Sequence, residues 1–174
     1  GLNTTAVSNL TTTQVAALTT AEIGALTAAQ IGTLTTTEVR SLSTVQAGAF
    51  TATQIGGLTT TQVGNFSTTQ LNALTTTQTR GLTTAQLNAL TQANLDALDA
   101  SKFSTTQVSG LDTTAIGNLS TTQVAALTTA EVGALTTAQI GTLTTTEVRA
   151  FSTAQAGAFT ATQIGGLTTT AVGN

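Results

Sequence analysis

The chain has 174 residues, 47 of them Thr, and it contains no Pro, Cys, Met, Trp, Tyr or His. Without imidazole or thiol groups it lacks the usual general bases, nucleophiles and zinc ligands, so we expect no enzyme, no cofactor and no metal site. The net charge is −3, and Arg40, Arg80, Lys102 and Arg149 are the only cations, which are too few for a surface that binds nucleic acid. The 40% hydrophobic content also disfavours disorder.

The ends of the chain carry no readable targeting segment. Gly1 to Thr5 lack a basic stretch and an apolar signal core, and no apolar run reaches the roughly 18 residues of a membrane span. Because the chain begins at Gly1 and ends at Asn174 inside a repeat, we expect a segment of something longer.

A bulky apolar residue, which we call the anchor, recurs every eight residues and divides the chain into octads. The period is broken once, by a five-residue step over 98–102, so octads occupy 2–97 and 103–174 of a single repeat array. The anchors are Leu2, Leu10, Leu18, Leu26, Leu34, Leu42, Phe50, Leu58, Phe66, Leu74, Leu82, Leu90 and Leu98, then Phe103, Leu111, Leu119, Leu127, Leu135, Leu143, Phe151, Phe159 and Leu167.

A longer repeat lies above the octads. Residues 1–65 match 110–174 at an offset of 109 and differ at ten positions. The differences are mild, such as Leu42 against Phe151, which indicates duplication followed by drift. We expect further 109-residue blocks in a longer protein.

Nearly every octad carries the signals of a helix start. In the octad that begins at Leu18, Thr19 and Glu22 have the spacing of a capping box, and Leu18 and Ile23 have that of a hydrophobic staple. A Gly or Asn follows soon after, as at Gly24, where a left-handed C-cap would end the helix. Each octad therefore predicts a helix of about one and a half turns, too short to be stable without stacking on neighbours.

Two other structures have the same period. A continuous helix fails, because eight residues advance about 800° and the apolar stripe would rotate by about 80° per octad. A Thr-rich β-solenoid remains open, although it places the Gln of each octad on the side of the anchor and would bury its amide. The predicted fold is therefore an all-α superhelical solenoid of very short capped helices, one per octad, with the β-solenoid as the alternative.

Two finer features are also predicted. Phe50 and Phe66 lie sixteen residues apart, as do Glu22 and Glu38, which indicates two octads per coil. Between Gly81 and Gly110 there is no glycine and the leucine content rises, so we expect a longer helix within 91–102 that absorbs the five-residue step.

Charged residues offer few candidate sites. Asp96, Asp99 and Lys102 form the one local cluster, whose spacing matches no calcium loop, so we interpret it as a solvated face. Glu22, Glu38, Glu131 and Glu147 stand at capping-box positions, where negative charge is favoured. Arg40, Arg80 and Arg149 stand near predicted helix C-termini. We expect no catalytic, cofactor-binding or metal-binding residue.

The octads Leu58 to Gly64 and Leu135 to Gly141 resemble the Leu-Thr-Thr-x-Gln-Val/Ile arrays of very long bacterial surface or secreted proteins, which are adhesin-like or fibre-forming. This resemblance covers the chain except for residues 95–102. It implies a structural role outside the cell or on its surface, as a stalk or self-associating fibre. We therefore expect other copies of the chain as partners, with no nucleic acid, no membrane span and no small-molecule ligand.

The threonine array gives a second functional hypothesis. Regularly spaced Thr methyl and hydroxyl groups resemble the surface of ice-binding solenoids, so ice or another ordered surface is the alternative target. The structural interpretation is that one Thr per octad caps a helix and its neighbours occupy the first turn.

Overall fold

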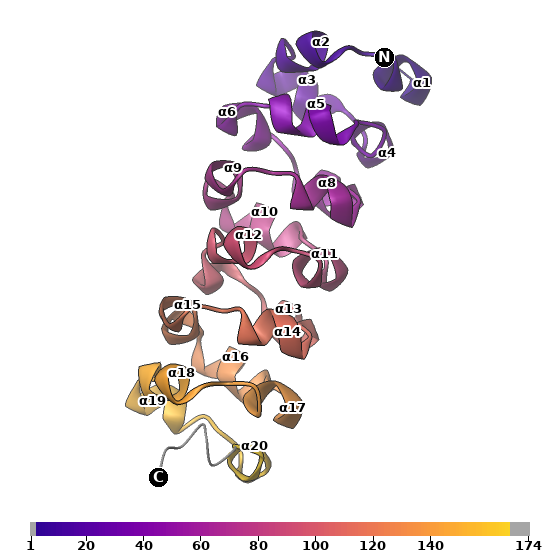
Figure 1. Ribbon diagram of the computed structural model, residues 1–174. Coiled ribbons are helices and arrows are strands. Elements are labelled where there is room, and N and C mark those ends of the chain that lie inside the picture. Colours follow the sequence, from indigo (N-terminus) through magenta and orange to yellow (C-terminus); the bar gives the residue numbers. More distant parts are fainter. Residues whose placement is uncertain (1–2, 168–174) are drawn as a thin grey trace. The chain divides into compact units, whose positions relative to one another are not determined.

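The computed structural model describes residues 3–167 and contains only helices there (Figure 1). It consists of two compact units, residues 1–98 and 99–174. The anchor Leu2 and the chain from residue 168 onwards lie outside the described residues.

The first unit holds twelve α-helices of four to six residues. They are α1 (Thr4–Ser8), α2 (Thr12–Ala16), α3 (Thr20–Ala25), α4 (Ala28–Ile31), α5 (Thr36–Ser41), α6 (Thr44–Ala47), α7 (Ala52–Gly57), α8 (Thr60–Gly64), α9 (Thr68–Asn72), α10 (Thr76–Gly81), α11 (Thr84–Asn88) and α12 (Gln92–Asp96).

The described part of the second unit begins with a 3₁₀ helix and continues with eight α-helices. They are η1 (Ala100–Lys102), α13 (Thr105–Gly110), α14 (Thr113–Gly117), α15 (Thr121–Ala126), α16 (Thr129–Ala134), α17 (Thr137–Ile140), α18 (Thr145–Ala150), α19 (Thr153–Ala156) and α20 (Ala161–Gly166).

One helix per octad, beginning at the third residue, confirms the predicted fold. The second residue is the N-cap with extended backbone, as at Thr19 (φ −72°, ψ 159°), and the next anchor resumes extended backbone, as at Leu26 (φ −67°, ψ 145°). No strand occurs within residues 3–167, so the β-solenoid alternative is wrong for the described chain.

Three octads, not two, complete one coil. Each helix packs against the third helix after it, so the first unit has three columns: α1, α4, α7 and α10; α2, α5, α8 and α11; and α3, α6, α9 and α12. The predicted two octads per coil is therefore wrong. Phe50 and Phe66, sixteen residues apart, are separated by two octads rather than a full coil, and their ring centroids lie 6.2 Å apart.

The five-residue step forms one shortened side of a coil. Asp99 caps η1, and η1 packs against α15, the third helix after it. The step thus takes the place of a whole octad in the three-column order of the second unit. The predicted longer helix within 91–102 is wrong, because α12 ends at Asp96 and the chain becomes extended at Asp99 (φ −79°, ψ 107°) before η1 begins.

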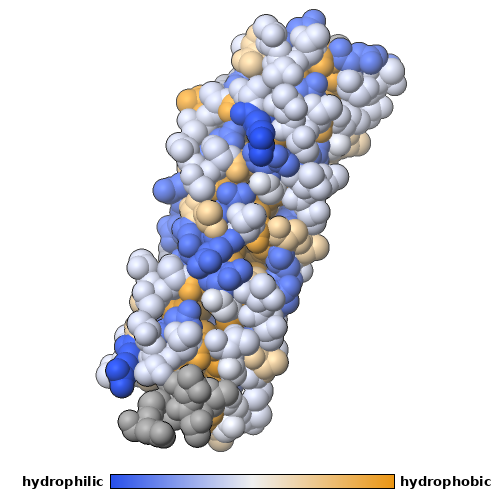
Figure 2. Space-filling model, in the orientation of Figure 1, coloured by the Kyte–Doolittle hydropathy of each residue, from blue (hydrophilic) through white to orange (hydrophobic). Residues whose placement is uncertain are grey.

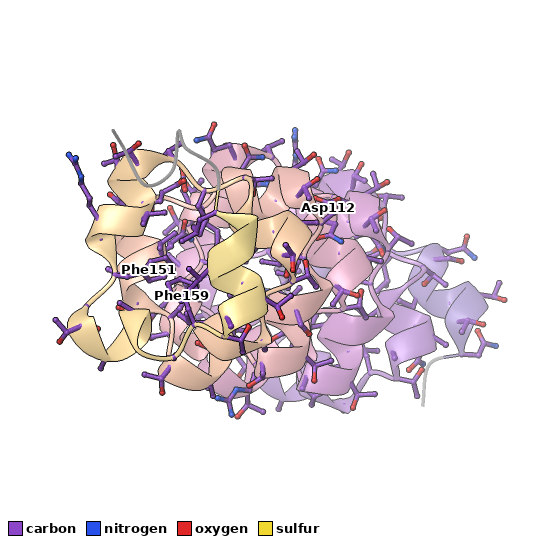
Figure 3. The ribbon with its side chains drawn as sticks, turned by 90° about the horizontal axis from the view of Figure 1, so that it is seen from below. Asp112, Phe151 and Phe159 are labelled. Atoms are coloured by element: carbon purple, nitrogen blue, oxygen red, sulfur yellow. The ribbon has the colours of Figure 1, made fainter. Side chains whose placement is uncertain are left out.

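The core is built from the anchors and from the sixth residue of each octad. Val15, Ile31 and Ile55 are fully buried, and anchors such as Leu58 and Phe103 are at most 5% exposed. In the second unit the half-buried rings of Phe151 and Phe159 meet edge to face, with centroids 5.1 Å apart (Figure 3). The anchor and staple positions identified in the sequence therefore form the apolar core.

Some glycines allow close packing of helices, and the described glycines do not form the predicted left-handed caps. The left-handed C-cap predicted at Gly24 and at the equivalent glycines is wrong: Gly24 lies inside α3, and Gly32 and Gly48 end their helices with right-handed backbone (φ −62° and −66°). In the first column, a Cβ on Gly57 would lie 2.8 Å from the methyl group of Ala28. Such a contact is tolerated only without a side chain, which explains a glycine where α7 crosses α4.

Candidate functional site

Capping boxes close the N-termini of nearly all helices in both units. At α7 the Thr51 hydroxyl accepts from the N–H of Gln54 (3.2 Å), while the Gln54 side-chain oxygen accepts from the N–H of Thr51 (2.7 Å). Two N–H groups that have no partner within the helix are satisfied in this way. The capping boxes predicted from the sequence are confirmed, including those of Thr11, Thr19, Thr27, Thr35, Ser67, Ser120 and Thr160.

The same glutamine also joins one coil to the one before it. The Nε2 group of Gln54 donates to the carbonyl oxygens of Ile23 (2.8 Å), Gly24 (3.5 Å) and Leu26 (2.5 Å), at the corner between α3 and α4. We call the fifth residue of an octad the bridging position. Gln54 is 2% exposed, and both ends of its amide are hydrogen-bonded, so its burial carries little desolvation cost.

The bridge has a fixed register in both units. Nine glutamines at bridging positions reach the carbonyls of the residues 28 and 31 positions earlier, and most of the nine also approach the carbonyl 30 positions earlier. These glutamines are Gln46, Gln54, Gln62, Gln70, Gln78, Gln86, Gln139, Gln155 and Gln163. The sequence predicted that these glutamines cap their helices, but it did not predict their hydrogen bonds to the preceding coil.

One bridge is shortened, and a hollow lies beside it. Asn94 occupies a bridging position in α12, and its Nδ2 group donates only to the Gly64 carbonyl, at 2.9 Å. The adjoining hollow measures about 510 Å³ and is lined by Asn94, Gly64, Arg40, Ser67 and Thr91 among others. A side chain one methylene shorter than Gln thus leaves polar surface uncovered at this corner.

Four glutamates also stand at bridging positions. Glu38, Glu131 and Glu147 are only 6%, 4% and 6% exposed, and one carboxylate oxygen of each accepts from the N–H of its own N-cap residue. Glu22 is exposed, and hydrogen bonds from the N–H and hydroxyl of Thr19 lower its pKa. The capping role predicted for these glutamates is confirmed.

The predicted charge cluster is split between the two units. Asp99 accepts from the Ser101 hydroxyl (2.6 Å) and N–H (3.1 Å), and Lys102 Nζ lies 3.8 Å from its carboxylate. The Ser101 hydroxyl bond is the main cause that lowers the pKa of Asp99, with the Ser101 N–H and Lys102 adding to it. Asp99 is thus the cap of η1, while Asp96 ends α12 in the first unit and is exposed.

The arginines lie where the helix dipole favours them. Arg40, Arg80 and Arg149 are exposed in the last turns of α5, α10 and α18. A cation there stabilises the negative end of a helix. Their placement confirms the predicted positions near helix C-termini.

The exposed threonines lie mainly at the N-caps and first turns. In the second column Thr12 and Thr13 of α2 and Thr60 and Thr61 of α8 are exposed. In the first column Ala28 and Ala29 replace such a pair in α4. Figure 2 shows a mostly pale surface on the face drawn, with apolar side chains in narrow seams. The Thr array is therefore distributed unequally among the columns.

Two features are absent from residues 3–167. No three acidic side chains come together in a way that could hold a metal ion. No helix in this part of the chain has the length and hydropathy needed to cross a bilayer. Nearly all buried polar side chains among residues 3–167 are the glutamines and glutamates at bridging positions.

The geometry defines a repeat protein, an α-solenoid with three octads per coil. A family model described as the ALTTAQ repeat matches residues 23–60, 117–145 and 132–169, which together make up more than half of the chain. The chain belongs to the ALTTAQ repeat family. The comparisons with curated proteins and with solved structures find no match.

Proposed function

We propose that the chain is a structural module of an extracellular or cell-surface filament or adhesin-like stalk, and that it has no catalytic activity. The observation that carries this proposal is the fixed register of the bridges. Gln46, Gln54 and Gln62 each join their own corner to the corresponding corner of the preceding coil. A load applied along such a module would be shared by hydrogen bonds and by the apolar core at every coil.

Self-association is part of the proposal. The described surface is rich in Thr, Ala and Gly, and only 6% of the residues are charged, so little electrostatic repulsion opposes contact between neighbouring modules. Leu10, Leu18 and Leu26 line a hollow of about 480 Å³ near the first coil and are half-exposed, whereas Leu34 and Leu42 are buried. This apolar surface is of the kind that another coil covers.

The association is tested by sedimentation of the 174-residue chain over a wide concentration range, with electron microscopy at the highest concentrations. The expected result is a mass that rises with concentration, together with elongated particles. Replacing Leu10 and Leu18 by Ser should reduce the association, and Thr60→Ser, on an exposed helix face away from that hollow, is the matched control. A monomer at all concentrations would refute self-association.

Location is tested separately, because the chain could be a mechanical module in any compartment. Antibody labelling of intact cells of the source organism is expected to detect the protein without permeabilisation. Labelling that needs permeabilised cells would contradict the proposed surface location. The mechanical role would then be tested separately, by measuring the force needed to unfold single molecules.

The exposed threonine pairs of the second column favour ice or another ordered surface as the second candidate. Thr12, Thr13, Thr60 and Thr61 occupy equivalent helix positions two coils apart, so their spacing is set by the stacking of the coils. Inhibition of ice recrystallisation by the purified chain, lost in Thr60→Ser and Thr61→Ser variants that lack the methyl groups, would support this candidate. Absence of inhibition at all concentrations would refute it.

A further inference from the structure

The glutamates at buried bridging positions face a different chemical problem from the glutamines. A glutamine offers an oxygen to its own N-cap and an N–H₂ group to the preceding coil, whereas an ionised carboxylate has no hydrogen to donate. Glu38, Glu131 and Glu147 each use one oxygen for the N-cap N–H, at 2.6 to 2.7 Å. By analogy with the glutamines, we expect their second oxygen where a glutamine carries its donor.

The register of the glutamine bridges gives the carbonyls expected opposite each glutamate. Counting back 28, 30 and 31 residues gives the carbonyls of Leu10, Ser8 and Val7 for Glu38, at the corner between α1 and α2. The neighbouring bridges Gln46 and Gln62 both follow this register.

The second unit repeats the arrangement twice. For Glu147 the corner holds the carbonyls of Ile116, Gly117 and Leu119, and the flanking bridges Gln139 and Gln155 fix the register. For Glu131 the corner is that of η1 and Phe103, where Phe103 N–H donates to the Ala100 carbonyl at 3.1 Å, as other anchors do to the residue three positions before them. The short step thus preserves this corner.

A carboxylate oxygen and three main-chain carbonyl oxygens repel one another unless a positive charge lies between them. The carbonyls also end a short helix, where the partial charge is negative. Oxygen ligands of this kind, in irregular geometry, suit Ca²⁺ better than Mg²⁺, which demands near-octahedral coordination and retains its water. A divalent ion also balances a carboxylate together with several carbonyl dipoles.

We propose that Glu38, Glu131 and Glu147 each bind Ca²⁺ between successive coils, with main-chain carbonyls of the preceding coil as the other protein ligands and water completing the coordination. The ion replaces the amide hydrogens that a glutamine supplies at the same place. Each site contains a single acidic side chain, so the sequence offers no pattern of acidic residues from which to predict it. The proposal does not depend on self-association or on the location of the protein.

The test compares the 174-residue chain with the triple variant Glu38→Gln, Glu131→Gln and Glu147→Gln. Calorimetric titration with CaCl₂ should find about three sites in the original chain and none in the variant. The Tm of the original chain should rise with the logarithm of the Ca²⁺ concentration above the dissociation constant, as expected for a ligand of the folded state. The Tm of the triple variant should not respond.

The matched control is Glu22→Gln. Glu22 occupies the same octad position but is exposed, and within residues 3–167 no corner of a preceding coil faces it. This variant should retain the full response to Ca²⁺. Absence of a response in the original chain, or a response that survives the triple substitution, would overturn the proposal. If acid stabilised the chain in the presence of EDTA and Ca²⁺ had no effect, the proposal would also be overturned, because a protonated carboxyl group would then supply the hydrogen of the bridge.

Discussion

The substitution Gln54→Glu separates the two roles of a bridging residue. Glutamate has nearly the same size and retains the capping-box acceptor towards Thr51, but it removes the N–H₂ group that donates to Ile23 and Leu26 at 2.8 and 2.5 Å. Leaving buried carbonyl groups without their donor costs about 1 to 3 kcal/mol. We expect a loss of that size in the free energy of unfolding, measured by urea denaturation in the presence of EDTA.

Gln14→Glu is the matched control, because Gln14 has the same capping box with Thr11 but is exposed, and it donates to no described carbonyl of another coil. A carboxylate near a helix N-terminus is favourable, so this change should be neutral or stabilising by a few tenths of a kcal/mol. Native-state hydrogen exchange should locate the loss in Gln54→Glu at the corner between α3 and α4. Equal effects of the two substitutions on stability would refute the bridging role of the amide.

Three further predictions follow from packing and electrostatics. Leu58→Ala should cost about 2 to 5 kcal/mol, because Leu58 is buried, while Thr60→Ala on an exposed face should be nearly silent; equal losses in urea denaturation would contradict the assigned core. Gly81→Ala should destabilise the fold by about 1 to 3 kcal/mol, because the new Cβ would lie 2.5 Å from a main-chain carbonyl oxygen of α7. Gly64→Ala should stabilise it by up to about 1 kcal/mol, because the space around Gly64 is open. Changes of the same sign in the two variants would be inconsistent with this packing. The lowered pKa of Glu22 means that its capping bond stabilises the fold above the unfolded pKa and is lost as the pH falls through the folded value; an NMR titration of the Glu22 carboxyl with a midpoint at or above the ordinary value would show that the bond is absent in solution.

The helices could be predicted because their signals are local. A cap, a box and a staple lie within six residues, so the sequence around Thr19 specifies a helix start without reference to the rest of the chain. The number of octads per coil could not be predicted in this way. It depends on how much the chain turns at each corner, and the sixteen-residue spacings of Phe50 and Phe66 and of Glu22 and Glu38 carry no information about that turn.

The bridging role was missed for a related reason. The burial of a glutamine amide was an argument against the β-solenoid, on the ground that a buried amide is costly. The helical structure buries the same amide and satisfies it twice, through an atom of its own octad and atoms 28 to 31 residues earlier. The partner within the same octad lies at a constant short spacing and can be recognised in the sequence. The partners 28 to 31 residues earlier can be recognised only once three octads are known to form one coil.

The two copies of the longer repeat show which exchanges of residues preserve the helix caps and the bridges. Among the ten differences, Asn3 is exchanged for Asp112 and Thr11 for Ser120, and each replacement still accepts the N–H three residues later. Val45, which is exposed, is exchanged for Ala154 without consequence for a cap or a bridge.

The bridging residues at 14, 22, 30, 38, 46 and 54 are the same in both copies, whereas Gln62 is exchanged for Ala171, which lies outside the described residues. Glu22 and Glu38 likewise return as Glu131 and Glu147. Glu22 and Glu131 stand in nearly identical octads, yet Glu22 is exposed whereas Glu131 is 4% exposed. The burial of the carboxylate, and with it the proposed cation site, therefore depends on the presence of a preceding coil and not on the octad alone.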